Sequence, residues 1–360
     1  MKSKTYNFSP GPGKLPRSVL QNIQNELLDF NNSGMSIMEF GHRTKQIEEL
    51  VNETAERVKR LMKLDDNYEV IFMQGGGCIQ FVMIPMNFSE KGEKVDYIDT
   101  GYWTTKAIEE AEILERDVKV IASSADKEYN YIPDNFKTRP EAAYLHICSN
   151  NTIMGTQWHN YPKVEIPVVI DMSSDILSRA IDYSAFDLVY AHAQKTIGTA
   201  GVTVVAIKKS FLKGIQKGLP NMLDYNSHVE KKSIFHTPPV FSIYVVWKML
   251  YWLENEIGGV DKMETINNKK AKLIYDFIDS SGFFKCTVES SSRSIMNVVF
   301  RAPTPEFDKT FVEDALKENI VGVEGHRSVG GLRASIYNPV SLEDVEVLVS
   351  FMKEFVRRYG

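Results

Sequence analysis

The chain has 360 residues, of which 43% are hydrophobic and 25% are charged, as in an ordinary globular protein. Its 42 basic and 47 acidic side chains give a net charge of −5, so a general attraction to nucleic acid or to an anionic membrane is not expected. Any anion site must therefore be a local cluster of cations.

Two periodicities alternate along the chain before residue 240. Residues 44–64 place apolar side chains on one stripe of a helix, and residues 68–73 follow as a short buried strand. The strand pattern recurs at residues 94–99, 117–122, 142–148, 167–171, 186–193 and 202–207. Near-continuous apolar strands that alternate with helices predict an α/β fold, with a mostly parallel sheet covered by helices on both faces.

The pattern changes after residue 240. Residues 240–257 predict a long apolar helix that ends at Gly258 and Gly259. The segments predicted beyond it are helices up to about residue 279, at 305–318 and at 341–359, and strands at 284–289, 295–300 and 331–337. We therefore expect an N-terminal arm at 1–15, a large α/β domain at 16–259 and a smaller C-terminal α/β domain at 260–360.

The cysteines are few and scattered. There are three, an odd number, and they lie far apart at Cys78, Cys148 and Cys286. This argues against a disulfide framework or a structural zinc site. The N-terminal residues lack the apolar core of a signal peptide, and no run reaches the roughly 18 apolar residues of a membrane span. We expect a cytoplasmic protein with no metal, no membrane contact and no nucleic-acid partner.

Polar residues stand where predicted strands end. Thr152, Asp171 and Lys195 each follow or close an apolar strand pattern. In open α/β sheets, ligands bind outside the carboxyl ends of the strands, so these three side chains are expected to converge. Lys195 is also followed by the glycine-containing stretch TIGTAG, which indicates tight backbone beside the lysine.

Three consecutive glycines follow another strand, in the stretch VIFMQGGGCIQF at residues 70–81. The N–H groups at such a helix start can face a phosphate, although a plain strand-to-helix turn has the same pattern. A lysine for an aldehyde, a carboxylate for a pyridine nitrogen and donors for a phosphate suit pyridoxal 5′-phosphate. Trp103, after a further strand, is a flat aromatic side chain that could cover the ring.

Motifs along nearly the whole chain resemble those of one family. They are NFSPGPGKLP, QGGGCIQF, TGYWTTKA, HICSNNTIMGTQW, DMSSDILSRAID, AQKTIGTAG, HTPP and GHRSVGGLRASIYN. The sequence resembles the phosphoserine aminotransferases, within the class V aminotransferases of the fold-type I pyridoxal-phosphate enzymes. The resemblance implies conversion of 3-phosphohydroxypyruvate and L-glutamate into O-phospho-L-serine and 2-oxoglutarate, in serine biosynthesis. Whether 4-phosphohydroxy-L-threonine is also formed, for pyridoxine synthesis, stays open.

The resemblance also implies roles for the cofactor-site residues. Lys195 resembles the Schiff-base lysine, Asp171 the partner of the pyridine nitrogen, Trp103 the ring-stacking aromatic and Thr152 the donor to the phenolic oxygen. The implied phosphate holders are the backbone of Gly77 and Cys78, the side chain of Gln194, and His236 and Thr237 of the other subunit. A homodimer with shared active sites is therefore expected.

The tripeptide Gly-His-Arg occurs twice, at residues 41–43 and 325–327, and Arg333 follows the second copy. Arginine binds carboxylate and phosphate through paired hydrogen bonds, which suits a substrate with two anionic ends. Surface charge pairs are the other interpretation. The substrate-binding residues implied by the resemblance are His42 and Arg43 of the neighbouring subunit and His326, Arg327 and Arg333 of the small domain.

Several positions depart from the family pattern. His192 stands where glycine is common, Thr196 and His236 where asparagine is common, and Thr199 where proline is usual. A histidine can still donate a hydrogen bond to phosphate, so cofactor binding is expected to survive.

Other functions of the same architecture remain open. One is a serine- or alanine-glyoxylate-type aminotransferase. Another is a cysteine desulfurase, which needs a nucleophilic cysteine on a mobile loop of the second half; the only candidate is Cys286, inside a predicted strand. The third is a non-catalytic pyridoxal-phosphate carrier or regulatory dimer.

Overall fold

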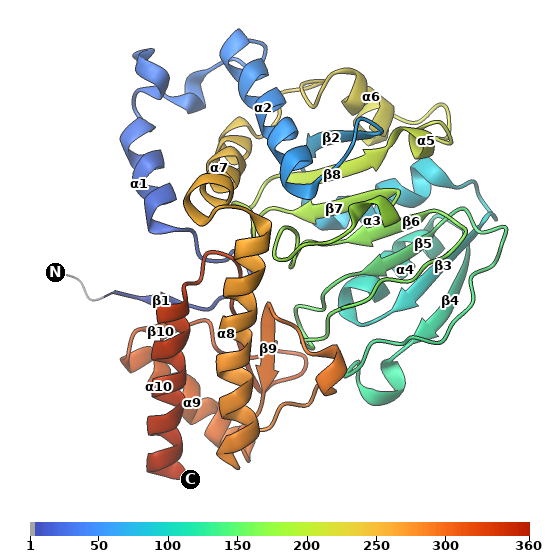
Figure 1. Cartoon of the computed structure of the whole chain (residues 1–360). Coiled ribbons are helices and arrows are strands. Elements are labelled where there is room, and N and C mark those ends of the chain that lie inside the picture. The colour runs from blue at the N-terminus through green and yellow to red at the C-terminus, as the bar shows by residue number, and fades with distance from the viewer. Residues whose placement is uncertain (1–3) are drawn as a thin grey trace.

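The computed structural model describes residues 4–360, and a seven-stranded sheet forms its centre (Figure 1). The strand order is β2-β8-β7-β6-β5-β3-β4. The strands are β2 (Tyr68–Met73), β3 (Lys94–Asp99), β4 (Asp117–Ser123), β5 (Leu145–Cys148), β6 (Val168–Asp171), β7 (Leu188–His192) and β8 (Thr203–Lys208). The predicted strands before residue 240 are thus confirmed as parts of one sheet.

Most neighbouring strands of this sheet are parallel, as predicted. The exception is β8, which runs antiparallel to both β2 and β7. The connection from β7 to β8 is therefore a short return that contains Lys195, and no helical crossover separates the two strands. An apolar run is the same in either direction, so the sequence pattern could not indicate this reversal.

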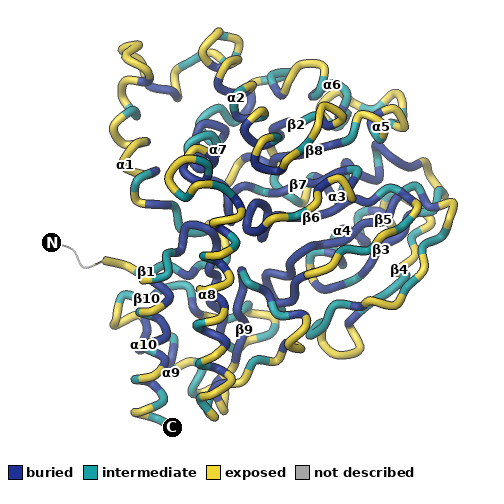
Figure 2. Tube along the Cα trace, viewed as in Figure 1, coloured by how far each residue is buried: buried dark blue, intermediate teal, exposed yellow. Residues whose placement is uncertain are grey.

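Both faces of the central strands are covered, which explains why these strands are largely apolar. In β7, Val189 and Ala191 belong to one buried cluster, while Leu188 and Tyr190 belong to another. Side chains alternate between the two faces of a strand, so the two clusters are the two sides of the sheet. Figure 2 shows most strands of the sheet as buried, and the edge strand β4 and the outer helical turns and loops as more exposed.

Helices form these covering layers. They are α1 (Arg17–Glu26), α2 (Lys45–Met62), α3 (Gly76–Phe88), α4 (Tyr102–Ile113), α5 (Lys209–Leu212), α6 (Tyr225–Glu230) and α7 (Val240–Tyr251). The apolar stripe predicted for α2 is buried, including Ile47, Leu50 and Val58. Helix α7 continues into a π-helical segment, Trp252–Ile257, which stops at Gly258 with φ 88°. Gly258 is therefore the predicted helix stop, and its left-handed backbone suits glycine.

The C-terminal part has its own buried core. Its elements are α8 (Val260–Ser281), β9 (Asn297–Phe300), α9 (Pro305–Lys317), β10 (Ile320–Val321), β11 (Leu332–Ser335) and α10 (Leu342–Tyr359). The N-terminal strand β1 (Tyr6–Asn7) pairs with β10, and Phe8 belongs to this core. Helix α8 contributes Val260 and Met263 to the core of the large sheet and later residues to the C-terminal core. The division at 15 and 260 stays a prediction, and residues 1–3 of the predicted arm lie outside the described residues.

One predicted strand is wrong. Residues 284–289 form an irregular segment in which only Lys285 makes an isolated bridge, to Arg301. Phe284 packs in the C-terminal core, and its neighbour Cys286 is half-buried. Side chains of this segment alternate between buried and exposed, which gives the sequence a strand-like pattern although no continuous partner strand pairs with it. Among residues 4–360, no helix is both long and apolar enough to span a bilayer.

Candidate active site

Lys195 lies just beyond the carboxyl end of β7 and is 9% exposed. Its Nζ donates a hydrogen bond to Thr152 Oγ1 at 2.8 Å and lies 5.5 Å from the centre of the Trp103 ring. Burial lowers the pKa of Lys195, and the charge of Asp171 opposes that shift. A buried amine with a lowered pKa is more readily a neutral nucleophile or base than a surface lysine.

Asp171 closes β6, the strand beside β7. Its Oδ1 accepts a hydrogen bond from Ser173 N–H at 2.8 Å. Burial raises the pKa of Asp171, while hydrogen bonding from Ser173 and the Lys195 charge pull it back. A buried carboxylate of this kind gains from a cationic partner, which a protonated pyridine nitrogen would supply.

The glycine turn before α3 forms one wall of the same cavity. Gly75 and Gly76 have φ of 98° and 71°, a left-handed backbone that other residues rarely adopt. The turn directs the start of α3, at Gly76 to Cys78, toward the cavity, where the first N–H groups of a helix lack partners within the helix. This end of α3 can therefore receive a phosphate.

The cavity has a volume of about 220 Å³ and brings together most of the predicted cofactor residues. Those among its lining residues are Gly77, Cys78, Trp103, Asp171, Gln194 and Lys195. Trp103 lies in the first turn of α4, and its buried Nε1 has no hydrogen-bond partner within residues 4–360. An amine, a carboxylate, an aromatic face and a helix start around one cavity fit pyridoxal 5′-phosphate.

Arg333 comes close to Lys195 from the C-terminal part of the chain, although within residues 4–360 neither Arg333 nor its contact Thr152 is among the residues that line the cavity. It lies on β11, is 5% exposed and donates from Nη1 to the Thr152 carbonyl oxygen at 3.0 Å. The same threonine thus contacts Lys195 through its hydroxyl and Arg333 through its carbonyl. Arg333 Nε is buried without a partner among the described residues, so part of the guanidinium remains free to bind an anion.

His326 and Arg327 lie in the loop before β11. His326 Nδ1 is 2.7 Å from Ser328 Oγ, and the His326 ring is 6.1 Å from the ring of Tyr102, the neighbour of Trp103. Burial lowers the pKa of His326, and the charges of Arg333 and Arg327 add to the effect. These residues are therefore near the cavity, although they are not part of its lining within residues 4–360.

The residues predicted to act across a subunit interface lie together elsewhere. His42 Nδ1 is 3.2 Å from Thr237 Oγ1, and neither His42, Arg43, His236 nor Thr237 lines the Lys195 cavity among residues 4–360. Both ring nitrogens of His236 are buried without a partner in the part of the chain described here. Within one chain these four residues therefore lie near one another but not at the Lys195 cavity of the same chain.

Several residues of the cavity were not predicted as site residues. They are Gly75, Gly76, Phe81, Cys148, Asn150, Ser173, Ser174 and His192. Ser173 donates its N–H to Asp171, and its hydroxyl accepts from His192 N–H at 3.1 Å. The stretch MSSD directly after Asp171 was a signal for these serines, because residues that follow a strand end share its edge of the sheet.

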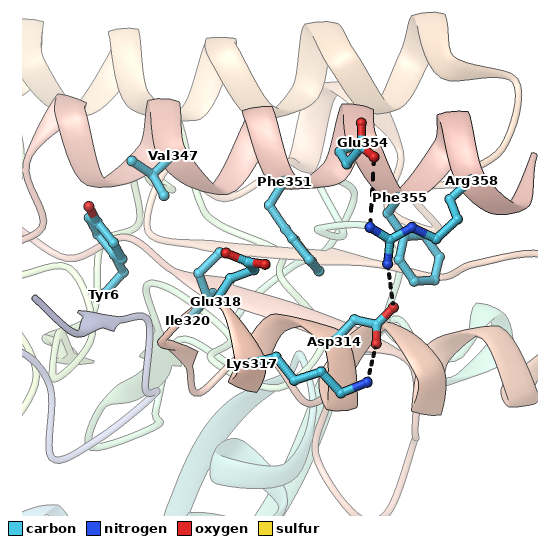
Figure 3. A pocket seen from close by; sticks show the side chains of 10 residues that line it. All are labelled: Tyr6, Asp314, Lys317, Glu318, Ile320, Val347, Phe351, Glu354, Phe355 and Arg358. Carbon is cyan, nitrogen blue, oxygen red and sulfur yellow. Dashed lines mark hydrogen bonds and ion pairs between the residues drawn. The ribbon is translucent and has the colours of Figure 1, made fainter. Parts of the chain in front are cut away.

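A second cavity, of about 440 Å³, lies between α9 and α10 near β1 (Figure 3). Most of its charged residues are paired with one another: Asp314 binds Lys317 at 2.7 Å and Arg358 at 3.5 Å, and Glu354 lies 3.7 Å from Arg358. Ion pairs of this kind are common near protein surfaces and supply no free nucleophile. The chemistry is therefore placed at the smaller cavity around Lys195.

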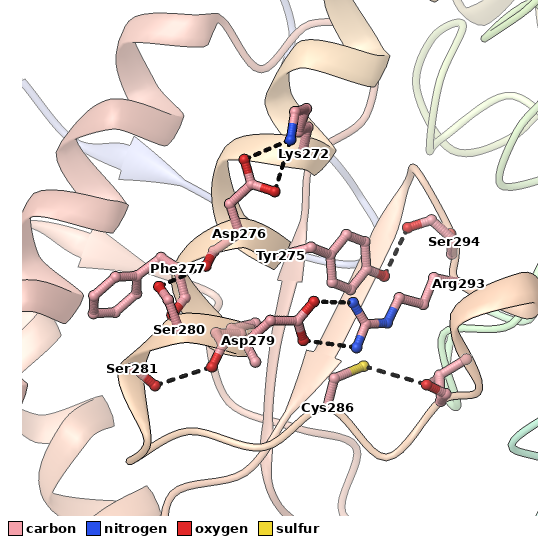
Figure 4. Close-up of polar contacts among 12 residues, drawn as sticks. Lys272, Tyr275, Asp276, Phe277, Asp279, Ser280, Ser281, Cys286, Arg293 and Ser294 are labelled. Atoms are coloured by element: carbon pink, nitrogen blue, oxygen red, sulfur yellow. Dashed lines mark hydrogen bonds and ion pairs between the residues drawn. The ribbon is translucent and has the colours of Figure 1, made fainter.

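Cys286 is a poor candidate for a sulfur nucleophile (Figure 4). Its Sγ is 3.9 Å from the Val288 carbonyl oxygen, and burial raises the pKa of the thiol. The nearby Arg293 guanidinium is engaged by Asp279 through hydrogen bonds of 2.7 and 2.8 Å. A raised thiol pKa disfavours the thiolate that a desulfurase requires.

Comparison with known proteins agrees with this geometry. The family described as class-V aminotransferase matches residues 5–348. A phosphoserine aminotransferase of Syntrophobacter fumaroxidans is 52% identical over 361 residues, with 100% of each chain covered. This chain belongs to the phosphoserine aminotransferase family.

Solved structures of phosphoserine aminotransferases share the whole fold. That from Bacillus circulans subsp. alkalophilus is 46% identical, with a TM-score of 0.97 and 99% of each chain covered. A structure described as pyridoxal-phosphate-bound phosphoserine aminotransferase from Trichomonas vaginalis is 36% identical, with a TM-score of 0.93, and covers 97% of this chain and 100% of that one. The predicted fold-type I transferase architecture is thus confirmed.

Proposed function

We propose that this chain transfers the amino group of L-glutamate to 3-phosphohydroxypyruvate, giving 2-oxoglutarate and O-phospho-L-serine for serine biosynthesis. Its cofactor is pyridoxal 5′-phosphate. The observation that carries the proposal is the buried Lys195 amine, hydrogen-bonded to Thr152 and placed beside Asp171 and Trp103 in one cavity. Identity of 52% over the full length with a phosphoserine aminotransferase supports the substrates.

The residues of the cavity have distinct tasks. When bound, pyridoxal 5′-phosphate supplies an aldehyde that exchanges amino groups and a cationic ring that accepts the electron pair of the substrate α-carbon. Lys195 Nζ takes the proton from that carbon, because burial favours its neutral, basic form. Asp171 holds the proton on the pyridine nitrogen, and Thr152 Oγ1 keeps the lysine amine oriented.

The cations around the cavity bind the two anionic ends of the substrate. Arg333 is the residue for the α-carboxylate, since it is buried beside Thr152 and retains free donors. His326 and Arg327 bind the distal carboxylate or phosphate, together with His42 and Arg43 of the partner subunit. Bidentate arginine contacts suit both groups, so one site accepts glutamate and the phosphorylated keto acid in turn.

The proposed homodimer accounts for the residues that one chain leaves away from its cavity. His42 and Thr237 contact each other at 3.2 Å, so one surface would present both to the partner's cofactor site. The segment just before His42 also exposes apolar side chains: Leu28 is 82% exposed and Met38 60%. A second copy that covers this segment would bury them.

A cytoplasmic location also remains a prediction, which rests on the scattered cysteines.

The test is an absorption spectrum of the purified protein with pyridoxal 5′-phosphate, before and after L-glutamate. The band of the lysine-bound cofactor should disappear with glutamate and return when 3-phosphohydroxypyruvate is added. O-phospho-L-serine should be identified as the product. A band that no amino acid alters would overturn the proposal in favour of a non-catalytic carrier.

Two control substrates separate the related activities. Alanine with glyoxylate tests the glyoxylate-type aminotransferases, and cysteine tests the desulfurases through release of sulfide. If alanine with glyoxylate, or cysteine alone, reacts faster than glutamate with 3-phosphohydroxypyruvate, the proposed substrates are wrong. The cofactor assignment would still stand.

A further inference from the structure

His192 is a residue of the cavity at a position where the resemblance to the family implies glycine. It ends β7, three residues before Lys195, at the carboxyl edge of the sheet. Its side chain lines the cavity together with Gly76, Gly77, Ser173 and Gln194. An imidazole therefore stands where the family pattern has no side chain.

The imidazole packs on the glycine turn that leads into α3. A methyl group added at Gly76 would lie 3.2 Å from His192 Cε1, 3.4 Å from Nδ1 and 3.5 Å from Nε2. Gly76 has φ of 71°, so the backbone conformation and the close imidazole both require glycine there. The ring is thus held against the end of the helix that can receive a phosphate.

One hydrogen bond holds the backbone of His192 and a second orients its ring. Its own N–H donates to Ser173 Oγ at 3.1 Å, and Gly201 N–H donates to His192 Nε2 at 3.4 Å. A neutral imidazole whose Nε2 accepts a hydrogen bond carries its proton on Nδ1. Burial and the charge of Lys195 lower the pKa of His192, which favours this neutral form. Nδ1, one of the two ring nitrogens beside Gly76, is therefore the hydrogen-bond donor of the ring.

We propose that His192 Nδ1 donates a hydrogen bond to the phosphate group of pyridoxal 5′-phosphate, as an additional phosphate ligand beside the start of α3 and Gln194. This inference rests on the proposed function, which supplies the cofactor. The donor is fixed by the sheet and the glycine turn of the same chain, so it acts independently of His236 and Thr237 of the partner subunit.

The test compares two ligands that differ only in the phosphate. Pyridoxal 5′-phosphate and pyridoxal are titrated into the full chain freed of cofactor, as wild type and as His192→Gly, with binding followed by absorbance. Loss of one hydrogen bond to a charged group should weaken the binding of pyridoxal 5′-phosphate by roughly tenfold or more in His192→Gly. Pyridoxal affinity should not change.

A matched variant separates the hydrogen bond from packing. His192→Asn places an amide donor near the position of Nδ1 and should keep most of the affinity lost in His192→Gly. The phosphorus NMR resonance of the bound phosphate should also move in His192→Gly holoenzyme and less in His192→Asn. If His192 had only a structural role, its replacement would weaken the binding of both ligands alike and leave the phosphorus resonance in place.

The outcomes are distinct. If His192→Gly lost equal affinity for the two ligands, or lost none for pyridoxal 5′-phosphate, the assignment of His192 would be overturned while the proposed function stands. A wild-type chain that binds neither ligand would overturn the proposed function and this inference together.

Discussion

Replacing Arg333 by alanine is expected to slow both halves of the transamination. The Arg333 Nη1 is occupied by the Thr152 carbonyl oxygen at 3.0 Å, while Nε is buried without a partner among residues 4–360. Nε and Nη2 can thus form two charged hydrogen bonds with a substrate α-carboxylate. At about 1.5 kcal/mol each, these bonds amount to about 3 kcal/mol, or roughly a hundredfold in kcat/KM.

Single-turnover absorbance measurements would follow the two halves separately, with L-glutamate in one and 3-phosphohydroxypyruvate in the other. Arg293→Ala is the matched control, because Arg293 is an arginine of the same part of the chain that pairs with Asp279 outside the cavity. Arg333→Lys should recover only part of the loss, since lysine keeps the charge but not the paired donors. If Arg333→Ala slowed only one half-reaction, Arg333 would not bind the carboxylate that both substrates share.

The remaining predictions concern the lysine, the distal anion, the pH response and assembly. Lys195→Ala should abolish steady-state turnover yet still retain the cofactor through its phosphate during dialysis; near wild-type turnover would refute its role. Arg43→Ala should lower kcat/KM for 3-phosphohydroxypyruvate by roughly tenfold more than that for hydroxypyruvate, and an unchanged ratio would refute a phosphate contact. Because burial lowers the pKa of Lys195 below the ordinary 10.5, its reaction with pyridoxal should accelerate as the pH rises and level off below that value, in a stopped-flow absorbance series. A midpoint at or above 10.5 would contradict the burial argument. Removal of the cofactor should weaken the homodimer in sedimentation velocity, and an isolated, fully active monomer would exclude shared sites.

The sheet and its covering helices could be predicted because their signal is local. A strand buried on both faces is apolar throughout, and α2 carries its apolar residues at helical spacing, so both patterns are readable without knowing any contact. The direction of β8 and the irregular path around Cys286 depend on which segments pair, and pairing over long sequence separations leaves no local periodicity.

The convergence of the candidate cofactor residues was predictable for a different reason. Thr152, Asp171 and Lys195 follow three strands, and the rule for the carboxyl edge of a parallel sheet places such residues together. The contact of Arg333 with the Thr152 carbonyl joins segments far apart in sequence, so spacing alone could not predict it. Likewise, the closeness of His192 to the Gly76 turn depends on two strand ends at one edge and is visible only in three dimensions.

The return from β7 to β8 has a consequence for how the lysine is held during motion and folding. Ala193 N–H donates to the Val202 carbonyl oxygen at 3.0 Å, so the loop that carries Lys195 is closed at its base by neighbouring antiparallel strands. Closing a short loop costs little chain entropy, and contacts of low sequence separation form readily. Arg333, in contrast, is brought to Thr152 by the C-terminal part of the chain. If Arg333 binds the substrate carboxylate as proposed, it can move with its own core while the loop that carries Lys195 stays closed at its base. Substrate entry and departure then need not disturb the lysine amine.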